Sequence, residues 1–256
     1  MAARTLALLP LACLAAWSGN AKLMRMCHQI RAPPGGEALD YIPGSMDDTI
    51  METLETGDLV FFQRKLTAMQ PLAALHTWIT RVRLRPRFDH CGWVYVDRLG
   101  RKFIVEETLK KVQCRPYSAR LLTSEATEIS VLQLKLERSK EMQKAASSFI
   151  TENVGRMSRI SLRHTVSALI SPDEMRKTGP DATPSFPSAA FVAEAYDAMG
   201  LVSKNQITIS QPSLPATAIT PRHLAESKVK LQVPLEKRFD GAEPPAFGRL
   251  LPIRLE

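Results

Sequence analysis

The sequence predicts an α+β fold in which an antiparallel β-sheet packs against helices. Residues 56–62 give a turn signal followed by a β-rich apolar run, and residues 89–108 give two strand-like runs around a turn. Residues 139–154 and 188–201 instead repeat apolar side chains at helical spacing. Because a sheet and a helix each need a partner for their apolar side, these segments are expected to share one core.

Length and charge narrow the functional classes. With 256 residues, of which 45% are hydrophobic, the chain can bury a full core. The formal net charge of +8 at pH 7 favours an anionic partner: anionic lipid, RNA or the acidic face of another protein subunit. The four cysteines lack the CxxC spacing of zinc sites and the histidines lack ligand spacing, so neither a metal nor a cofactor is predicted.

We expect the chain to divide into three parts. Residues 1–45 are a targeting or membrane-anchor leader with a linker, residues 46–230 are the folded domain, and residues 231–256 are an extended C-terminal tail. The linker is marked by its APPGG run and the tail by scattered prolines.

The leader combines an apolar run, Leu6 to Trp17, with basic residues, and no acidic residue precedes Glu37. This pattern favours a mitochondrial, membrane-associated location. A secretory signal is the first alternative. An uncleaved anchor is the second, with residues 2–21 forming a tilted helix, because the apolar run itself is shorter than the about 20 residues of a membrane span.

The folded domain is expected to begin with a short helix or turn at residues 46–54, followed by a buried strand at residues 56–62. A helix over residues 66–82 comes next. Its apolar side would consist of Leu72, Leu75, Trp78 and Ile79.

Arginine then occupies every second position of a short run. The four residues are Arg81, Arg83, Arg85 and Arg87. In an extended segment alternate side chains point the same way, so the four guanidiniums would form an anion-binding patch. A solvated basic edge is the alternative interpretation.

The hairpin of residues 89–108 carries the most reactive side chains of the sheet. A period of two places His90 and Cys91 on opposite faces, which argues against Cys91 as a catalytic partner of His90. Strands near residues 112–117 and 128–136 would continue an antiparallel meander. An amphipathic helix at residues 139–154 and a loop-rich stretch at residues 156–184 would follow.

Ser188 lies at the start of the last long helix, on the side that faces the core. Pro184 and Pro187 keep the segment before the helix extended. Gly200 is suited to the left-handed conformation that follows the last helical turn. A hydroxyl in this position is either a helix cap or a nucleophile.

The order of these segments resembles the circularly permuted papain-fold superfamily, which includes NlpC-like and YiiX-like amidases and relatives of lecithin:retinol acyltransferase. The matching segments, in chain order, are GDLVFF (57–62), DHCGWVYV with His90, VEET with Glu106, SAAFVAEAY (188–196) and ITPRHLAES (219–227). The resemblance covers about Leu54 to Ser227. It implies a permuted papain-like sheet packed against a nucleophile-bearing helix.

One departure from the superfamily bears on activity, because its nucleophilic cysteine aligns with Ser188. The resemblance therefore implies a vestigial or weak catalytic set of Ser188, His90 and Glu106, in which Glu106 orients the histidine. Glu107 replaces Glu106 if the strand register differs by one. A serine hydroxyl cannot be stored as an anion, so it would need His90 to remove its proton during attack.

Three functions follow from these patterns. The favoured one is a catalytically inactive domain that serves as a structural or interaction subunit of a larger assembly. The alternative is an active amidase, peptidase or acyl hydrolase that uses Ser188, His90 and Glu106. The third, RNA binding through the arginine run, lacks the aromatic stacking platform that base recognition needs.

Overall fold

The computed structural model describes residues 2–31, 44–159, 186–203, 219–231 and 246–254. The predicted linker and most of the predicted loop-rich stretch lie outside the described residues, as does part of the predicted tail.

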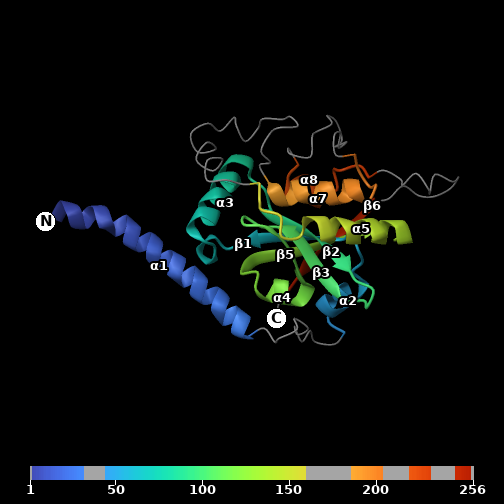
Figure 1. Ribbon diagram of the computed structural model, residues 1–256, viewed down its shortest axis with the longest axis horizontal. Helices are drawn as coiled ribbons and strands as arrows, with labels where there is room; N and C mark the ends of the chain where they lie inside the picture. The colour runs from blue at the N-terminus through green and yellow to red at the C-terminus, as the bar shows by residue number, and fades with distance from the viewer. Residues whose placement is uncertain (1, 32–43, 160–185, 204–218, 232–245, 255–256) are drawn as a thin grey trace.

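The centre of the structure is a six-stranded antiparallel sheet with the strand order β4-β3-β2-β1-β5-β6 (Figure 1). Its strands are β1 (Leu59–Arg64), β2 (His90–Val96), β3 (Lys102–Glu107), β4 (Val112–Pro116), β5 (Ala126–Lys135) and β6 (Ala246–Ile253). The predicted α+β class and the antiparallel sheet are confirmed.

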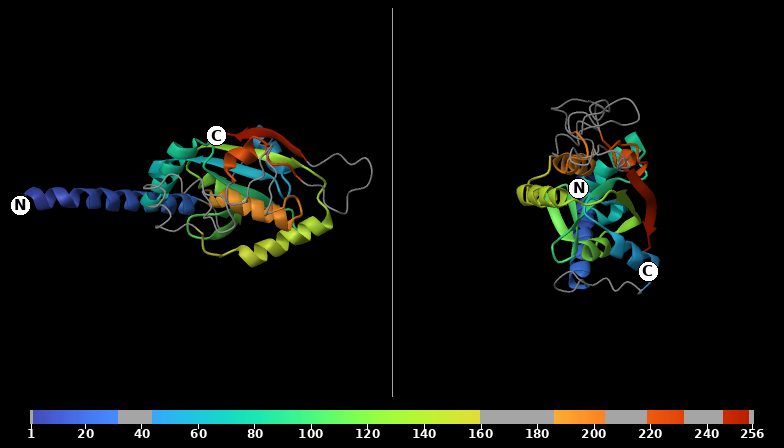
Figure 2. Two further views of the ribbon diagram at one scale, coloured as in Figure 1. Left: turned by 90° about the horizontal axis from the view of Figure 1, so that it is seen from above. Right: turned by 90° about the vertical axis from the view of Figure 1, so that its right-hand side faces the viewer.

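Helices lie on both faces of this sheet (Figures 1 and 2). The described helices are α1 (Ala2–Arg31), α2 (Met46–Thr53), η1 (Leu66–Ala68), α3 (Pro71–Leu84), α4 (Tyr117–Leu122), α5 (Lys140–Asn153), α7 (Pro187–Ala198) and α8 (Pro221–Ala225). The helices α7 and α5 share one core with the sheet, which we call the α7 face. The short helices α2 and α4 share a second core with the opposite face, the α4 face.

The two cores follow from the alternation of buried side chains along β1. Leu59 and Phe61 belong to the core on the α7 face, whereas Val60 and Phe62 belong to the core on the α4 face. All of these side chains are buried, as expected for a central strand covered by helices on both sides.

The prediction that β5 continues a meander after β4 is wrong. The strand β5 pairs with β1, on the side of β1 that β2 leaves open. The short helix α4 separates β4 from β5 in the sequence and lies against β3 and β4. The chain therefore leaves the edge of the sheet and returns beside its central strand.

The apolar side predicted for the helix at residues 66–82 is also wrong. The helix α3 starts at Pro71, and Leu72, Leu75 and Trp78 are exposed by 38–49%. Among the predicted residues only Ile79 is buried. The buried side of α3 carries two threonines. The Thr77 hydroxyl accepts a hydrogen bond from Arg64, and the Thr80 hydroxyl donates one to the carbonyl of His76. This side of the helix therefore cannot be recognised in the sequence as an apolar face.

The arginine run does not form the predicted extended segment. Arg81 and Arg83 belong to α3, and Arg85 ends that helix in the left-handed conformation, with φ at 44°. In a helix, alternate residues point in different directions, so the geometric basis for a four-arginine patch is absent. Arg81 pairs with Asp89 and Arg87 with Glu128, and anion binding by the run stays a prediction.

The described parts of the two chain ends are a long helix and an edge strand. The helix α1 extends away from the domain (Figures 1 and 2), and its Trp17 indole donates a hydrogen bond to the carbonyl of Thr67, with an N–O distance of 3.1 Å. Within the described residues no helix is long and apolar enough to cross a membrane. At the other end, β6 lies within the predicted extended tail and pairs along β5.

Candidate functional site

His90 and Glu106 are joined by a buried hydrogen bond on the α4 face of the sheet. His90 Nε2 lies 2.6 Å from Glu106 Oε2, and both side chains are at most 5% exposed. The β2–β3 register explains the contact, because it places Gly92 opposite Glu106 and His90 is the next residue on the same face.

Gly92 leaves the space that this contact needs. A Cβ atom at position 92 would lie 2.9 Å from Ile104 Cγ2 and 3.1 Å from Glu106 Cβ. Real Cβ atoms scarcely approach a neighbour this closely, so the glycine allows the Glu106 side chain to cross toward His90.

Two arginines share the same carboxylate. Arg120 Nε lies 2.5 Å from Glu106 Oε1 and its Nη2 lies 3.0 Å from Oε2, while Arg115 Nη2 also contacts Oε1. Arg120 additionally lies over the ring of Phe62, 4.1 Å from its centroid. Nothing in the sequence around Arg115 or Arg120 indicates this pairing, because α4 brings the second arginine in from outside the hairpin.

The ionisation of the pair follows from burial and from these charges. Burial opposes the charged form of Glu106, but Arg120, Arg115 and His90 outweigh it and hold the pKa of the carboxyl well below its usual range. Burial, together with the nearby charge of Arg64, lowers the pKa of His90 to about 4 despite the attraction of Glu106. His90 is therefore neutral at pH 7, with Nε2 donating to the carboxylate.

Ser188 occupies the second position of α7 and approaches β2 from the opposite face. Phe186 is the N-cap residue and makes no side-chain cap, and Pro187 opens the helix. The Ser188 hydroxyl is not a cap either: it accepts a hydrogen bond from the amide of Cys91 at 3.4 Å and lies 3.9 Å from the Cys91 sulfur. The interpretation of Ser188 as a capping residue is therefore wrong.

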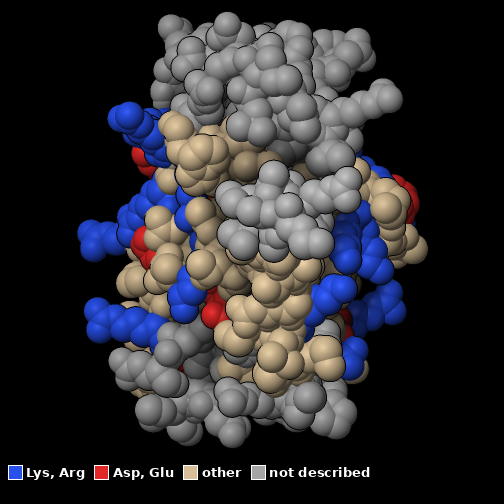
Figure 3. Space-filling view, turned by 90° about the vertical axis from the view of Figure 1, so that its left-hand side faces the viewer, with Lys and Arg blue, Asp and Glu red and all other residues tan. Residues whose placement is uncertain are grey.

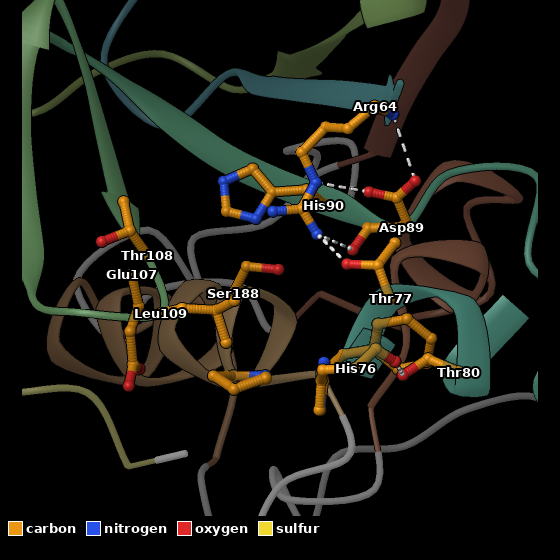
Figure 4. A pocket seen from close by; sticks show the side chains of 12 residues that line it. Arg64, His76, Thr77, Thr80, Asp89, His90, Glu107, Thr108, Leu109 and Ser188 are labelled. Carbon is orange, nitrogen blue, oxygen red and sulfur yellow. Dashed lines mark hydrogen bonds and ion pairs between the residues drawn. The ribbon is translucent and has the colours of Figure 1, made fainter. Parts of the chain in front are cut away.

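The three predicted catalytic residues are not assembled as one hydrogen-bonded chain. Among the described residues, no hydrogen bond joins Ser188 to His90. Both residues border one small pocket at the end of β2 (Figure 4), whose cavity volume is about 30 Å³. That volume is room for water rather than for an acyl or peptide substrate.

Cys91 does not replace the missing thiol. Its side chain is fully buried and packs with the core of the α7 face. Burial raises the pKa of this thiol to about 12, so the thiolate form that acts as a nucleophile is not populated near neutral pH.

Glu107 points to the other face of β3 and has a different set of partners. Its carboxylate pairs with Arg159 at 2.6 Å, and Arg159 also contacts Glu194 on α7. The register thus gives Glu106, not Glu107, to His90. The Glu107 cluster holds the segment that follows α5 against α7.

A buried carboxylate with two arginine partners lies beside the same small pocket. Asp89, which is buried, receives hydrogen bonds from Arg64, with Nε 2.6 Å from Oδ1, and from Arg81. Burial disfavours the Asp89 anion, but the two arginines lower the pKa of this carboxyl overall. Sequence reasoning placed Arg81 in a surface patch and assigned no role to Arg64 or Asp89. The described residues contain no group of three or more side chains that could hold a metal ion.

A scan against protein families finds no match, and no curated protein matches the chain. Among solved structures, the chain is similar to the metalloprotein YiiX from Escherichia coli O157:H7, at 15% sequence identity and a TM-score of 0.40. The match covers 79% of this chain and 97% of that chain.

Proposed function

We propose that this protein is a catalytically inactive domain of the permuted papain-like (NlpC-like, YiiX-like) type, and that it serves as a structural or interaction subunit of a larger assembly. The observation that carries the proposal is the position of the Ser188 hydroxyl, which bonds to the amide of Cys91 and not to His90. The residue at the nucleophile position thus supports the packing of α7 on β2.

The electrostatics of the histidine support the same conclusion. A general base works best with a pKa near the working pH, and the pKa of His90 is about 4. In a serine hydrolase the carboxylate behind the histidine stabilises the imidazolium that forms during attack. Here Arg115 and Arg120 already compensate the charge of Glu106, so little of that stabilisation is left.

The surface supports a role in an assembly. In Figure 3, Lys and Arg side chains gather on both sides of a strip of uncharged residues, with few Asp or Glu between them. Apolar side chains are exposed along α1, namely Leu14, Leu23, Met24 and Met26. An excess of positive charge next to apolar side chains suits acidic protein subunits first and anionic lipid second, with RNA less favoured. We place the assembly at a mitochondrial membrane, with the secretory pathway as the alternative.

The inactivity is tested with a fluorophosphonate probe and a panel of profluorescent esters and amides, applied to the wild type and to Ser188→Ala. We expect no labelling of Ser188, the same background turnover in both proteins, and a loss of at most about 1–2 kcal/mol of stability in the variant. Labelling and turnover that disappear in Ser188→Ala would instead establish the alternative, a hydrolase using Ser188, His90 and Glu106.

The role in an assembly is tested separately. A tagged chain of 28.5 kDa is fractionated by size from cells of its source under low-salt conditions. We expect it to migrate as a much larger species, with Ser188→Ala behaving in the same way, because assembly does not depend on the hydroxyl. A monomer in every fraction would contradict the proposal.

A further inference from the structure

A second and much larger cavity, of about 690 Å³, opens on the side of His90 that faces away from Ser188. It lies between α1, the η1–α3 segment, β4 and α4, and Ser188 does not line it. Small-molecule sites in proteins have volumes of about 300–1,000 Å³, so the cavity is large enough for a ligand. The helix α1 contributes a wall through Met24 and lies against η1 and α3.

One side of the cavity carries an excess of positive charge. Arg115 and Arg120 share the single negative charge of Glu106, so one of their two positive charges remains uncompensated. Lys110 adds another, because it is exposed and makes no ion pair among the described residues. Lys65 also lines the cavity but is paired with Glu125, at 3.7 Å.

Arg115 is only partly covered by the rest of the protein. Its Nη2 contacts Glu106, but its side chain is 37% exposed and lines the cavity. A ligand with two acceptor oxygens that contacts the exposed part of this guanidinium would balance its charge.

Apolar side chains also line the cavity, between polar ones. They are small or flexible, among them Met24, Met69, Ala73, Leu109, Pro116 and Ala119. Methionine adapts its shape to the group it contacts, and alanine leaves room for a bulky neighbour. Positive charge and apolar surface in one cavity are the features that an amphiphilic anion matches.

We propose that this cavity binds an amphiphilic anion, a carboxylate or phosphate monoester head attached to an apolar tail. The head lies against Arg115 and Lys110, and the tail lies between α1, α3 and α4. The site goes beyond the proposed function and does not depend on it, since Ser188 is not part of the wall and no bond is made or broken.

Binding is tested on the full chain by isothermal titration calorimetry with octanoate, octyl phosphate, octanol and inorganic phosphate, below the concentrations at which the amphiphiles form micelles. We expect octanoate, octyl phosphate or both to bind at least tenfold more tightly than octanol and inorganic phosphate. The two anionic ligands distinguish a carboxylate from a phosphate head. Equal binding of octanol, binding of phosphate alone, or no binding of any ligand would overturn the proposal.

Variants locate the site. Lys110→Gln should weaken binding about three- to tenfold, and Arg115→Gln more than tenfold, because a guanidinium can bond an anionic head through two N–H groups at once. Lys144→Gln removes an exposed lysine of α5, outside the cavity, and should change nothing. Because Arg115→Gln also removes a partner of Glu106, its folding is checked by thermal melting, and Lys110→Gln decides the result if that variant unfolds.

A substitution that fills the cavity beside α3 completes the test. Ala73→Trp should abolish binding without a large change in melting temperature, since Ala73 is only partly buried on α3. The matched control is Ala198→Trp, which places the same side chain on the exposed end of α7. Unchanged affinity in Ala73→Trp, or an equal loss in Ala198→Trp, would rule out this cavity as the binding site.

Discussion

Glu106 concentrates more charge interactions than any other side chain of the site. It is completely buried on β3, and its two oxygens contact His90, Arg115 and Arg120. Such a carboxylate contributes little net stability compared with an apolar side chain of the same shape, but its removal leaves its partners buried without compensation. The cluster therefore fixes which side chains can surround His90.

Replacing Glu106 by a neutral residue should destabilise the protein, because its charged partners lose their compensating carboxylate. Glu106→Gln is expected to lower the free energy of unfolding by about 3–5 kcal/mol, because two guanidiniums would face an amide in place of an anion. Urea unfolding followed by circular dichroism measures the change. The matched control is Glu128→Gln, on β5, whose partner Arg87 is 62% exposed; it should cost less than about 1 kcal/mol. Similar losses in the two variants would contradict the buried network.

His90 should make the stability of the protein depend on pH. Its pKa is about 4 in the folded protein and about 6.5 in an unfolded chain, so between these values the unfolded state binds more protons. Stability is therefore expected to fall as the pH decreases from about 6.5 towards 4. The low pKa of Glu106 acts in a lower window, where stability is lost as the pH falls below about 4.3.

His90→Gln isolates the histidine contribution, because glutamine keeps a neutral donor toward Glu106 and does not titrate. We expect the slope of unfolding free energy against pH, measured between pH 6.5 and 5, to be smaller in the variant than in the wild type. Some slope should remain, since burial and the charge of Lys228 also lower the pKa of His223. An unchanged slope would mean that His90 is not buried in its neutral form.

At the scale of elements, the pairing of β2 with β3 depends on the small residue at position 92. Gly92→Ala would place its Cβ 2.9 Å from Ile104 and 3.0 Å from the carbonyl oxygen of Val105. We expect a loss of about 1–3 kcal/mol in urea unfolding, because neither the backbone nor a packed side chain can move away freely. Gly248→Ala, on β6, meets no atom closer than 3.4 Å and should be nearly neutral. Equal losses of stability in Gly92→Ala and Gly248→Ala would show that position 92 is not more tightly packed than position 248.

The elements themselves were largely predictable from local patterns. The hairpin, the strand that contains Phe61, and the helix that starts after Ser139 follow from alternation, helical spacing and capping, which act over a few residues. The order of the strands could not be predicted from local patterns, because the position of β5 beside β1 depends on where α4 directs the chain. The face of α3 was misjudged because its buried side carries threonines, Thr77 bonded by Arg64 and Thr80 bonded to the backbone one turn earlier.

The site was predictable only to the extent that it lies within the hairpin. A period of two and a short turn place His90 near Glu106, and the sequence alone allows that inference. The arginines that set the charge of the pair come from β4 and α4, and the partner of the Ser188 hydroxyl is a backbone amide. Neither kind of contact leaves a local pattern in the sequence.

At the scale of the whole molecule, α1 is the element least integrated with the rest. Of its side chains that the structure describes, only Ala21 is completely buried. Among its described side chains, the polar contacts are the Trp17 bond to Thr67 and a bond from the Ser18 hydroxyl to the Gln70 side chain, at 3.0 Å. Hydrophobic stabilisation scales with buried apolar area, so α1 should add little to the stability of the sheet domain.

Removal of residues 1–31 should therefore leave a cooperatively folded protein. We expect the free energy of unfolding in urea to fall by less than about 2 kcal/mol, since among the described side chains the truncation removes one buried alanine and two hydrogen bonds. Binding of amphiphilic anions should weaken in the same protein, because Met24 no longer closes the cavity. Loss of cooperative unfolding would instead show that α1 belongs to the folded core, and would move the predicted start of the domain at residue 46 to the beginning of α1.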